Sequence, residues 1–343
     1  MTPSKSYTTV FILIIIALLL CLITNISLGS VIIPWGDTIS SLVGGNVEKE
    51  SWRHIIIDYR LPKAITAIVV GSGLGISGIL MQTLFRNPLA GPFVLGISSG
   101  ASLGVALLIL GSSSLGALVS GLIISKWGLV IASSLGSVLV LFAVMLVSIR
   151  VRDTMAILII GLMFGSITAA IVSVLSYFAP AEQLQQYIFW GFGSLGNLSW
   201  NDIVIFATIF LIGVILTLVV IKPLNTLLLG ENYAKSMGLN IKVSRFLIIL
   251  TTGILAGGIT AFAGPIAFIG LAVPHLTRQL FHTSDHRILI PAIILLGSII
   301  MLICDTIAQL PSSDYTLPIN AITSLIGAPV VIWLLVRKRK MLF

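Results

Sequence analysis

Long uncharged hydrophobic runs are the feature that most restricts how this sequence can fold. Three of them, Tyr7–Trp35, Pro92–Ser125 and Thr154–Ala181, each reach or exceed the roughly 20 residues that cross the hydrocarbon layer as a helix. Only 9% of the 343 residues are charged, against about 25% in soluble domains. Lipid permits only helices or closed barrels, and the runs lack the alternation of strands. The sequence therefore predicts an all-α, polytopic membrane protein.

The runs predict about ten transmembrane helices in a single transmembrane domain that covers residues 1–343. The first run is interpreted as a retained span, because only Lys5 precedes it and residues 25–30 form a poor cleavage site. The apolar stretch Leu115–Ile124 is too short to span and is expected at the outer face. The expected spans are 10–30, 61–82, 92–110, 128–149, 154–178, 202–221, 243–262, 265–281, 288–308 and 318–336.

The positions of the basic residues predict the orientation in the membrane. With the N-terminus inside, 14 of the 19 lysine and arginine residues face the cytoplasm. The other five, which face outward, are Lys49, Arg53, Arg60, Lys63 and Lys126. This asymmetry follows the positive-inside rule and predicts that both termini are cytoplasmic. The net charge of +8 is therefore assigned to membrane orientation, and no nucleic-acid partner is expected.

A short motif recurs in the two parts of the chain. Gly91-Pro92 followed by Leu95-Gly96 returns as Gly264-Pro265 followed by Ile269-Gly270. An offset of five spans would place the copies in opposite orientations, as in the inverted repeats of many transporters. The sequence thus predicts two five-helix halves, about 1–200 and 201–343, with chance similarity as the alternative.

A polar segment after the sixth span, about residues 223–240, is predicted to lie in the cytoplasm. Pro223 is expected to end the span, and short helices broken at Leu229-Gly230 are expected to follow. Glu231 would then lie in the first turn of the second short helix, where a carboxylate suits the helix dipole. A short rigid element of this kind could receive force from a soluble motor. An ordinary connecting loop is the alternative interpretation.

Two further features of this segment support a defined helix. Gly238 suits a left-handed cap after Met237. Tyr233 and Met237 are four residues apart and would share one helix face.

Several longer motifs run in order from residue 60 to residue 329. They are Arg60-Leu61-Pro62-Lys63; Gln82 with Arg86-Asn87-Pro88-Leu89-Ala90-Gly91-Pro92; Leu228-Leu229-Gly230-Glu231 with Ala234 and Met237-Gly238-Leu239; Gly264-Pro265 through Gly270-Leu271-Ala272-Val273-Pro274-His275 to Arg278; Leu317-Pro318; and Gly327-Ala328-Pro329. Together they resemble the FecCD-type permeases, a family of ABC importer subunits for ferric siderophores, haem and cobalamin.

The resemblance implies a set of partners and a location. A second permease copy would enclose one central path with the first. Two cytoplasmic ATPase subunits would bind ATP and magnesium, so that this chain would hold no cofactor and would not be an enzyme. An extracytoplasmic substrate-binding protein would deliver the cargo. The location would be the bacterial cytoplasmic membrane, where the chain contacts lipid along many spans.

The resemblance also assigns roles to residues. ATPase coupling falls on Leu229, Gly230, Glu231, Tyr233, Ala234, Met237, Gly238, His275 and Arg278. Docking of the binding protein falls on Arg60, Lys63 and Gln309, although the family more often has arginine at the position of Lys63 and a basic residue at that of Gln309. Interfacial anchoring is the alternative for Arg60 and Lys63. The translocation path and its gate fall on Met163, Ser166, Gln183 and Gln186.

The remaining polar residues are few. Asp305 lies within the ninth span, where an ionisable group is a functional candidate by default. A structural hydrogen bond to backbone or to another helix is the interpretation we favour. The four histidines show no metal-ligand spacing, so no metal site is expected. Cys21 and Cys304 are assigned no chemistry.

These features together predict an ATP-driven importer with a ferric siderophore as the leading cargo and haem or cobalamin as alternatives. A transporter driven by an ion gradient is the main rival, because the repeat and Asp305 would also suit it. An intramembrane enzyme would need paired polar groups in the spans, and the sequence offers little besides Asp305. The identity of the chelate and the choice between homodimer and heterodimer stay open.

Overall fold

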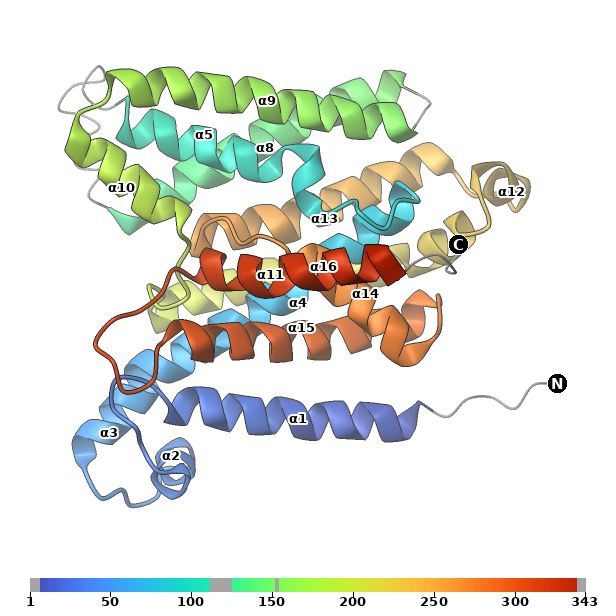
Figure 1. Cartoon of the computed structure of the whole chain (residues 1–343). Coiled ribbons are helices and arrows are strands. Elements are labelled where there is room, and N and C mark those ends of the chain that lie inside the picture. The colour runs from blue at the N-terminus through green and yellow to red at the C-terminus, as the bar shows by residue number, and fades with distance from the viewer. Residues whose placement is uncertain (1–6, 112–124, 152–153, 338–343) are drawn as a thin grey trace. The chain divides into compact units, whose positions relative to one another are not determined.

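The computed structural model describes residues 7–111, 125–151 and 154–337, and within these ranges every regular element is a helix (Figure 1). This confirms the all-α prediction. The predicted interfacial stretch Leu115–Ile124 lies outside the described residues.

Each of the ten predicted spans coincides with one long or medium helix. These helices are α1 (Thr8–Ser27), α4 (Leu61–Leu84), α5 (Ile97–Ile109), α8 (Lys126–Arg150), α9 (Thr154–Phe178), α11 (Trp200–Leu227), α13 (Ile241–Ala263), α14 (Ile269–Phe281), α15 (His286–Ala308) and α16 (Ile319–Arg337). Among the described residues, seven helical segments are long and apolar enough to cross a membrane. Helices α5 and α14 have only 13 residues each. The number of ten spans and the side of the termini stay predictions.

Shorter elements connect the long helices. Between α1 and α4 lie α2 (Trp35–Leu42), α3 (Glu50–His54) and a π-helix, η1 (Ile55–Arg60), which continues directly into α4. A 3-10 helix, η2 (Pro92–Leu95), precedes α5. Two more short elements within the described residues are α10 (Ala181–Gly191) and α12 (Glu231–Ser236).

The chain forms two compact units that interleave in sequence. Unit 1 consists of Met1–Ile76, Leu195–Ile205 and Ala267–Phe343, and unit 2 of Ser77–Ser194 and Phe206–Ile266. Each unit therefore takes segments from both predicted sequence halves. The division into two repeated sequence halves, about 1–200 and 201–343, is a different division from these compact units and stays a prediction.

Small residues bring helices close together inside unit 1. On α4 and α15, Gly71 and Gly297 face each other so closely that neither position has room for a Cβ atom. Next to them the hydroxyls of Ser72 and Ser298 are 2.9 Å apart. Close approach through small residues is the usual packing device of membrane helices.

Unit 2 uses the same device more extensively. Gly100 and Gly104 on α5 lie against the backbone of Gly136 and Ala132 on α8, again without room for a Cβ. Gly161 on α9 lies against the backbone carbonyl of Val94 in η2, directly before α5. Helices α5, α8 and α9 therefore form a closely packed group whose backbones are in direct contact.

The recurring Gly-Pro motif leads into a helix of the same length in both places, although only the first copy contains a 3-10 helix. After Gly91-Pro92 and after Gly264-Pro265, the chain passes through a left-handed residue and then starts a 13-residue helix. The left-handed residues are Gly96, with φ 73°, and Phe268, with φ 64°. The order of elements thus supports a repeat, while its inverted orientation stays a prediction.

Candidate functional site

The predicted cytoplasmic segment begins later than expected. Pro223 lies inside α11, which continues to Leu227, so the prediction that Pro223 ends the helix is wrong. A proline removes one backbone hydrogen bond, and near the end of a long helix that single loss is tolerated. The Thr226 hydroxyl donates to the carbonyl of Lys222 at 2.9 Å and supports this last turn.

Helix α12 has the caps that the sequence predicted. Gly230 precedes the helix with φ 104° and ψ 149°, a conformation that is essentially restricted to glycine. Glu231 is the first helical residue, and Met237 is the residue at the C-terminal cap. Gly238 follows with φ 83°, which confirms the predicted left-handed cap. Glycines at both ends therefore fix the direction of this six-residue helix.

Three large apolar side chains on α12 and directly next to its two ends are exposed. The exposed fractions of Leu229, Tyr233 and Met237 are 59%, 59% and 60%, whereas Ala234 is fully buried. We call the first three residues the α12 face. A cluster of large apolar side chains that stays exposed outside the long apolar helices is typical of an interaction surface.

Two arginines of unit 2 hold the other side of this segment. Arg245 on α13 donates to a Glu231 carboxylate oxygen at 3.1 Å and also to the backbone carbonyl of Val151 at 3.1 Å. Arg86, which follows α4, donates to the carbonyl of Leu228 at 3.3 Å. The charged groups therefore face the protein while the apolar face is left outside. Sequence reasoning assigned no role to Arg245, although it is the one charged residue in the predicted span 243–262.

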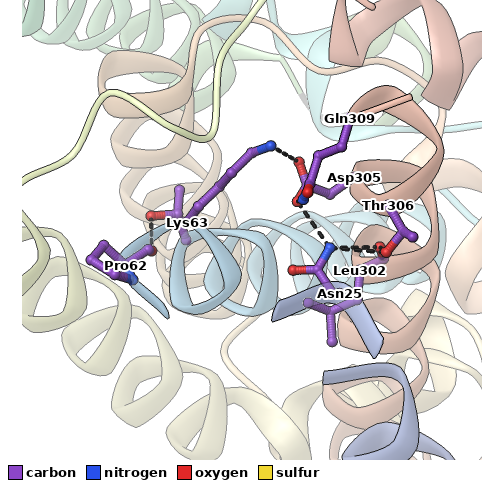
Figure 2. Close-up of polar contacts among 8 residues, drawn as sticks. Asn25, Pro62, Lys63, Leu302, Asp305, Thr306 and Gln309 are labelled. Atoms are coloured by element: carbon purple, nitrogen blue, oxygen red, sulfur yellow. Dashed lines mark hydrogen bonds and ion pairs between the residues drawn. The ribbon is translucent and has the colours of Figure 1, made fainter. Parts of the chain in front are cut away.

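A second polar site, in unit 1, surrounds Asp305 near the end of α15 (Figure 2). Asp305 is 1% exposed. Its carboxylate pairs with Lys63 Nζ at 3.0 Å and accepts hydrogen bonds from Asn25 Nδ2 at 3.0 Å and Gln309 Nε2 at 2.7 Å. Asn25 also donates to Thr306 Oγ1 at 3.0 Å. These five residues, the Asp305 cluster, tie α1 and α4 to α15 and confirm the structural interpretation of Asp305.

Arg60 is buried at the start of α4, in the last position of η1. One guanidinium nitrogen donates to the carbonyls of Ile26 and Ser27, each at 2.8 Å, and another donates to the carbonyl of Val31. Arg60 thereby closes the end of α1 and the loop that follows it. With Lys63 and Gln309 in the Asp305 cluster, all three predicted docking residues contact groups of their own chain. Their docking role stays a prediction.

The predicted path residues lie on α9 and α10. Met163 is 54% exposed, and Ser166 is also exposed, with its hydroxyl donating to the carbonyl of Leu162 at 3.1 Å. Gln183 is half-buried and Gln186 exposed on α10. Only 17% of the residues in the most apolar part of α9 are buried, so this helix exposes a long face to lipid or to another chain. A role in translocation stays a prediction.

The other two predicted coupling residues lie on α14. His275 is buried, at 5% exposure, and Arg278 is half-buried. They belong to unit 1, whereas α12 belongs to unit 2. Their part in coupling stays a prediction.

The sequence profile of the FecCD transport family matches residues 15–337, nearly the whole chain. The chain belongs to this family. As a FecCD permease it is a multi-pass protein of the bacterial cytoplasmic membrane and the transport subunit of an ABC importer, a system that works with ATPase and binding-protein partners.

Individual relatives agree over most of their length. The hemin transport system permease protein HmuU of Yersinia pestis is 36% identical over 288 residues, which is 84% of each chain. The vitamin B12 import system permease protein BtuC of Klebsiella pneumoniae is 35% identical over 324 residues, covering 94% of this chain and 92% of the relative. A solved inward-facing structure assigned to a metal-chelate type ABC transporter matches with a TM-score of 0.83 at 29% identity, covering 96% of this chain and all of the other.

Proposed function

We propose that this FecCD permease carries a metal chelate into the cell, driven by an ATPase that docks on the α12 face. The observation that carries the proposal is the construction of α12. It is a short helix fixed by glycine caps and by Arg86 and Arg245, and it presents the α12 face outward.

The geometry suits transmission of force by contact. A helix laid into an apolar groove of a partner is a common docking mode. Because Glu231 is paired with Arg245, the contact with the ATPase would rest on Leu229, Tyr233 and Met237 rather than on the Glu231 charge. A rigid connection behind this apolar face allows movement of the ATPase to reach the membrane part of unit 2.

The proposed cargo is a metal chelate. The relatives named for hemin and for vitamin B12 are almost equally similar to this chain, at 36% and 35% identity. These similarities therefore favour the class and do not separate its members. A ferric siderophore, which the family motifs suggest, is the first cargo to test, followed by haem and cobalamin.

The proposed path lies between two permease copies. The exposed side of α9, with Met163 and Ser166, carries no charged residue between Thr154 and Phe178. A wall without charges releases a large cargo more readily than one that binds it strongly at a single point. Gln183 and Gln186 on α10 are proposed to contribute to the gate, and the surface near Arg60 to the contact with the binding protein.

The contacts of Asp305 do not favour the ion-gradient alternative. A carrier of protons or sodium ions needs a carboxylate that binds and releases the ion. The Asp305 carboxylate instead has an ammonium partner in Lys63 and two amide donors. These contacts are typical of a structural ion pair between helices.

The test is uptake into liposomes that contain the permease, its ATPase and the binding protein. Labelled ferric siderophore, haem and cobalamin are offered separately, with and without ATP on the ATPase side. We expect ATP-dependent accumulation of one of the three. Uptake by the permease alone under a proton or sodium gradient, without ATP, would contradict the proposal.

A further inference from the structure

Arg245 contacts a second element besides α12, and docking of the ATPase on the α12 face does not account for that second contact. It is 8% exposed, and its guanidinium joins two elements that follow different helices of unit 2. One is Glu231, the first residue of α12, and the other is the backbone carbonyl of Val151, directly after α8. A planar guanidinium with several donors can bind both acceptors at once.

The Val151 contact leads to the helices of the predicted path. Val151 follows the last residue of α8, and α9 begins at Thr154. Helices α5, α8 and α9 are packed through glycines without room for a Cβ, of which Gly136 on α8 precedes Val151 by 15 positions. We therefore expect a displacement of this end of α8 to move the packed helices together. The contacts therefore form a continuous route from α12 to the exposed side of α9.

We infer that Arg245 is the positioning residue through which displacement of α12 reaches α8 and α9. The inference rests on the proposed function, because it assigns the route taken by the movement that the ATPase drives. Through the bond to Glu231, Arg245 moves together with α12. Through the bond to Val151, that movement reaches the end of α8. Both links are needed.

The experiment measures movement of α9 without any cargo. A reporter thiol is introduced by Ser166→Cys, at an exposed position of α9, in a chain that also carries Cys21→Ser and Cys304→Ala. The permease is assembled with its ATPase in lipid nanodiscs. The rate of labelling by a small maleimide is measured without nucleotide and after trapping with ATP and vanadate.

In the parent chain we expect the two labelling rates to differ. With Arg245→Ala we expect the ratio of the two rates to be about one, because trapping of the ATPase with nucleotide no longer changes the conformation of α9. ATPase binding is measured in parallel, and the labelling rates are compared at an ATPase concentration that saturates each variant. Arg245→Lys should give an intermediate ratio, since a single ammonium replaces a two-sided contact. If Arg245→Ala does not fold, the lysine variant carries the test.

A charge exchange separates the two links. Glu231→Arg together with Arg245→Glu restores an ion pair, but a carboxylate has no hydrogen to donate to the Val151 carbonyl. We expect this double variant to bind the ATPase and still show a ratio of about one, because the second link is missing. Lys242→Ala, which removes an exposed cation from the same end of α13, is the matched control and should keep the parental ratio.

The outcomes distinguish the inference from the function on which it rests. A parental ratio in Arg245→Ala, or its full recovery in the charge exchange, would overturn the role of Arg245 alone. If the parent chain itself shows no response to nucleotide, the inferred movement of α9 is refuted, whereas the proposed function fails only if the liposome assay shows no ATP-dependent uptake.

Discussion

At the Asp305 cluster and at α12, charged side chains bind groups of their own chain, but the two regions leave different surfaces outside. Around Asp305, the predicted docking residues Lys63 and Gln309 take part in the cluster, and Arg60 binds nearby backbone carbonyls. At α12, Glu231 pairs with the largely buried Arg245, while Leu229, Tyr233 and Met237 remain exposed. Charged residues close to the end of a membrane helix can therefore stabilise the fold instead of binding a partner. The residues left exposed for a partner can be apolar.

The largest expected effect comes from removing one partner of the ion pair in the Asp305 cluster. Lys63→Met leaves the buried carboxylate without its cation and should lower the free energy of unfolding by about 3 kcal/mol. Thermal unfolding in detergent measures the change. Lys63→Met together with Asp305→Asn removes both charges and should recover most of the loss. Equal instability of the single and the double variant would show that the ion pair is not the cause.

The next effect tests whether Arg60 acts inside the protein or on a partner. Arg60→Gln removes charged donors from three carbonyls and should lower the free energy of unfolding by about 2 kcal/mol. Binding of the substrate-binding protein is then measured at low and high salt. If Arg60 is structural, the effect on affinity should be nearly independent of salt. A loss that appears mainly at low salt would instead support direct docking, because exposed charges are screened by ions.

A smaller effect is expected from the backbone of the α12 segment. Gly230→Ala places a side chain at φ 104° and should destabilise the turn by about 1–2 kcal/mol, with reduced transport per ATP hydrolysed. Gly36→Ala, at a helical position with open space around it, is the control and should be neutral. If Gly230→Ala transports as much cargo per ATP hydrolysed as the parent chain, a fixed turn at Gly230 is not required for coupling.

The smallest effect concerns the α12 face itself. Tyr233→Ala and Met237→Ala should each weaken ATPase binding by about 1 kcal/mol without changing stability, because these side chains are exposed in the permease alone. The dissociation constant of the detergent-solubilised complex is the measurement. Ser236→Ala, an exposed polar position on the same helix, serves as control. Full affinity in both apolar variants would place the ATPase contact elsewhere.

The two regions also differ in how far the sequence predicts them. Local signals predicted the α12 segment well, because the roles of Gly230, Glu231 and Gly238 depend on near neighbours in the chain. The termination at Pro223 was wrong, since tertiary context decides whether a proline ends a helix or lies inside it. A single sequence shows helix positions, but not which distant side chains meet.

The Asp305 cluster illustrates that limit. Asn25 and Asp305 are 280 positions apart, and nothing in one sequence pairs them. The same is true of Arg245 and Val151, which are 94 positions apart. The sequence did single out Asp305, because a charge within a span is expensive. It singled out Lys63 only through the family resemblance, as a docking residue. It could not show that each compensates the other.

The short helices α5 and α14 have a consequence for how the chain is made. At 1.5 Å per residue, 13 residues extend only about 20 Å, less than the hydrocarbon layer. The irregular backbone before α14 needs protein partners, such as the Asn320 side chain that accepts a hydrogen bond from the amide of Ala267. Asn320 lies more than 50 residues later, on α16. This contact can therefore form only after α16 has been synthesised, so the backbone before α14 reaches its final hydrogen bonding late in the synthesis of the chain.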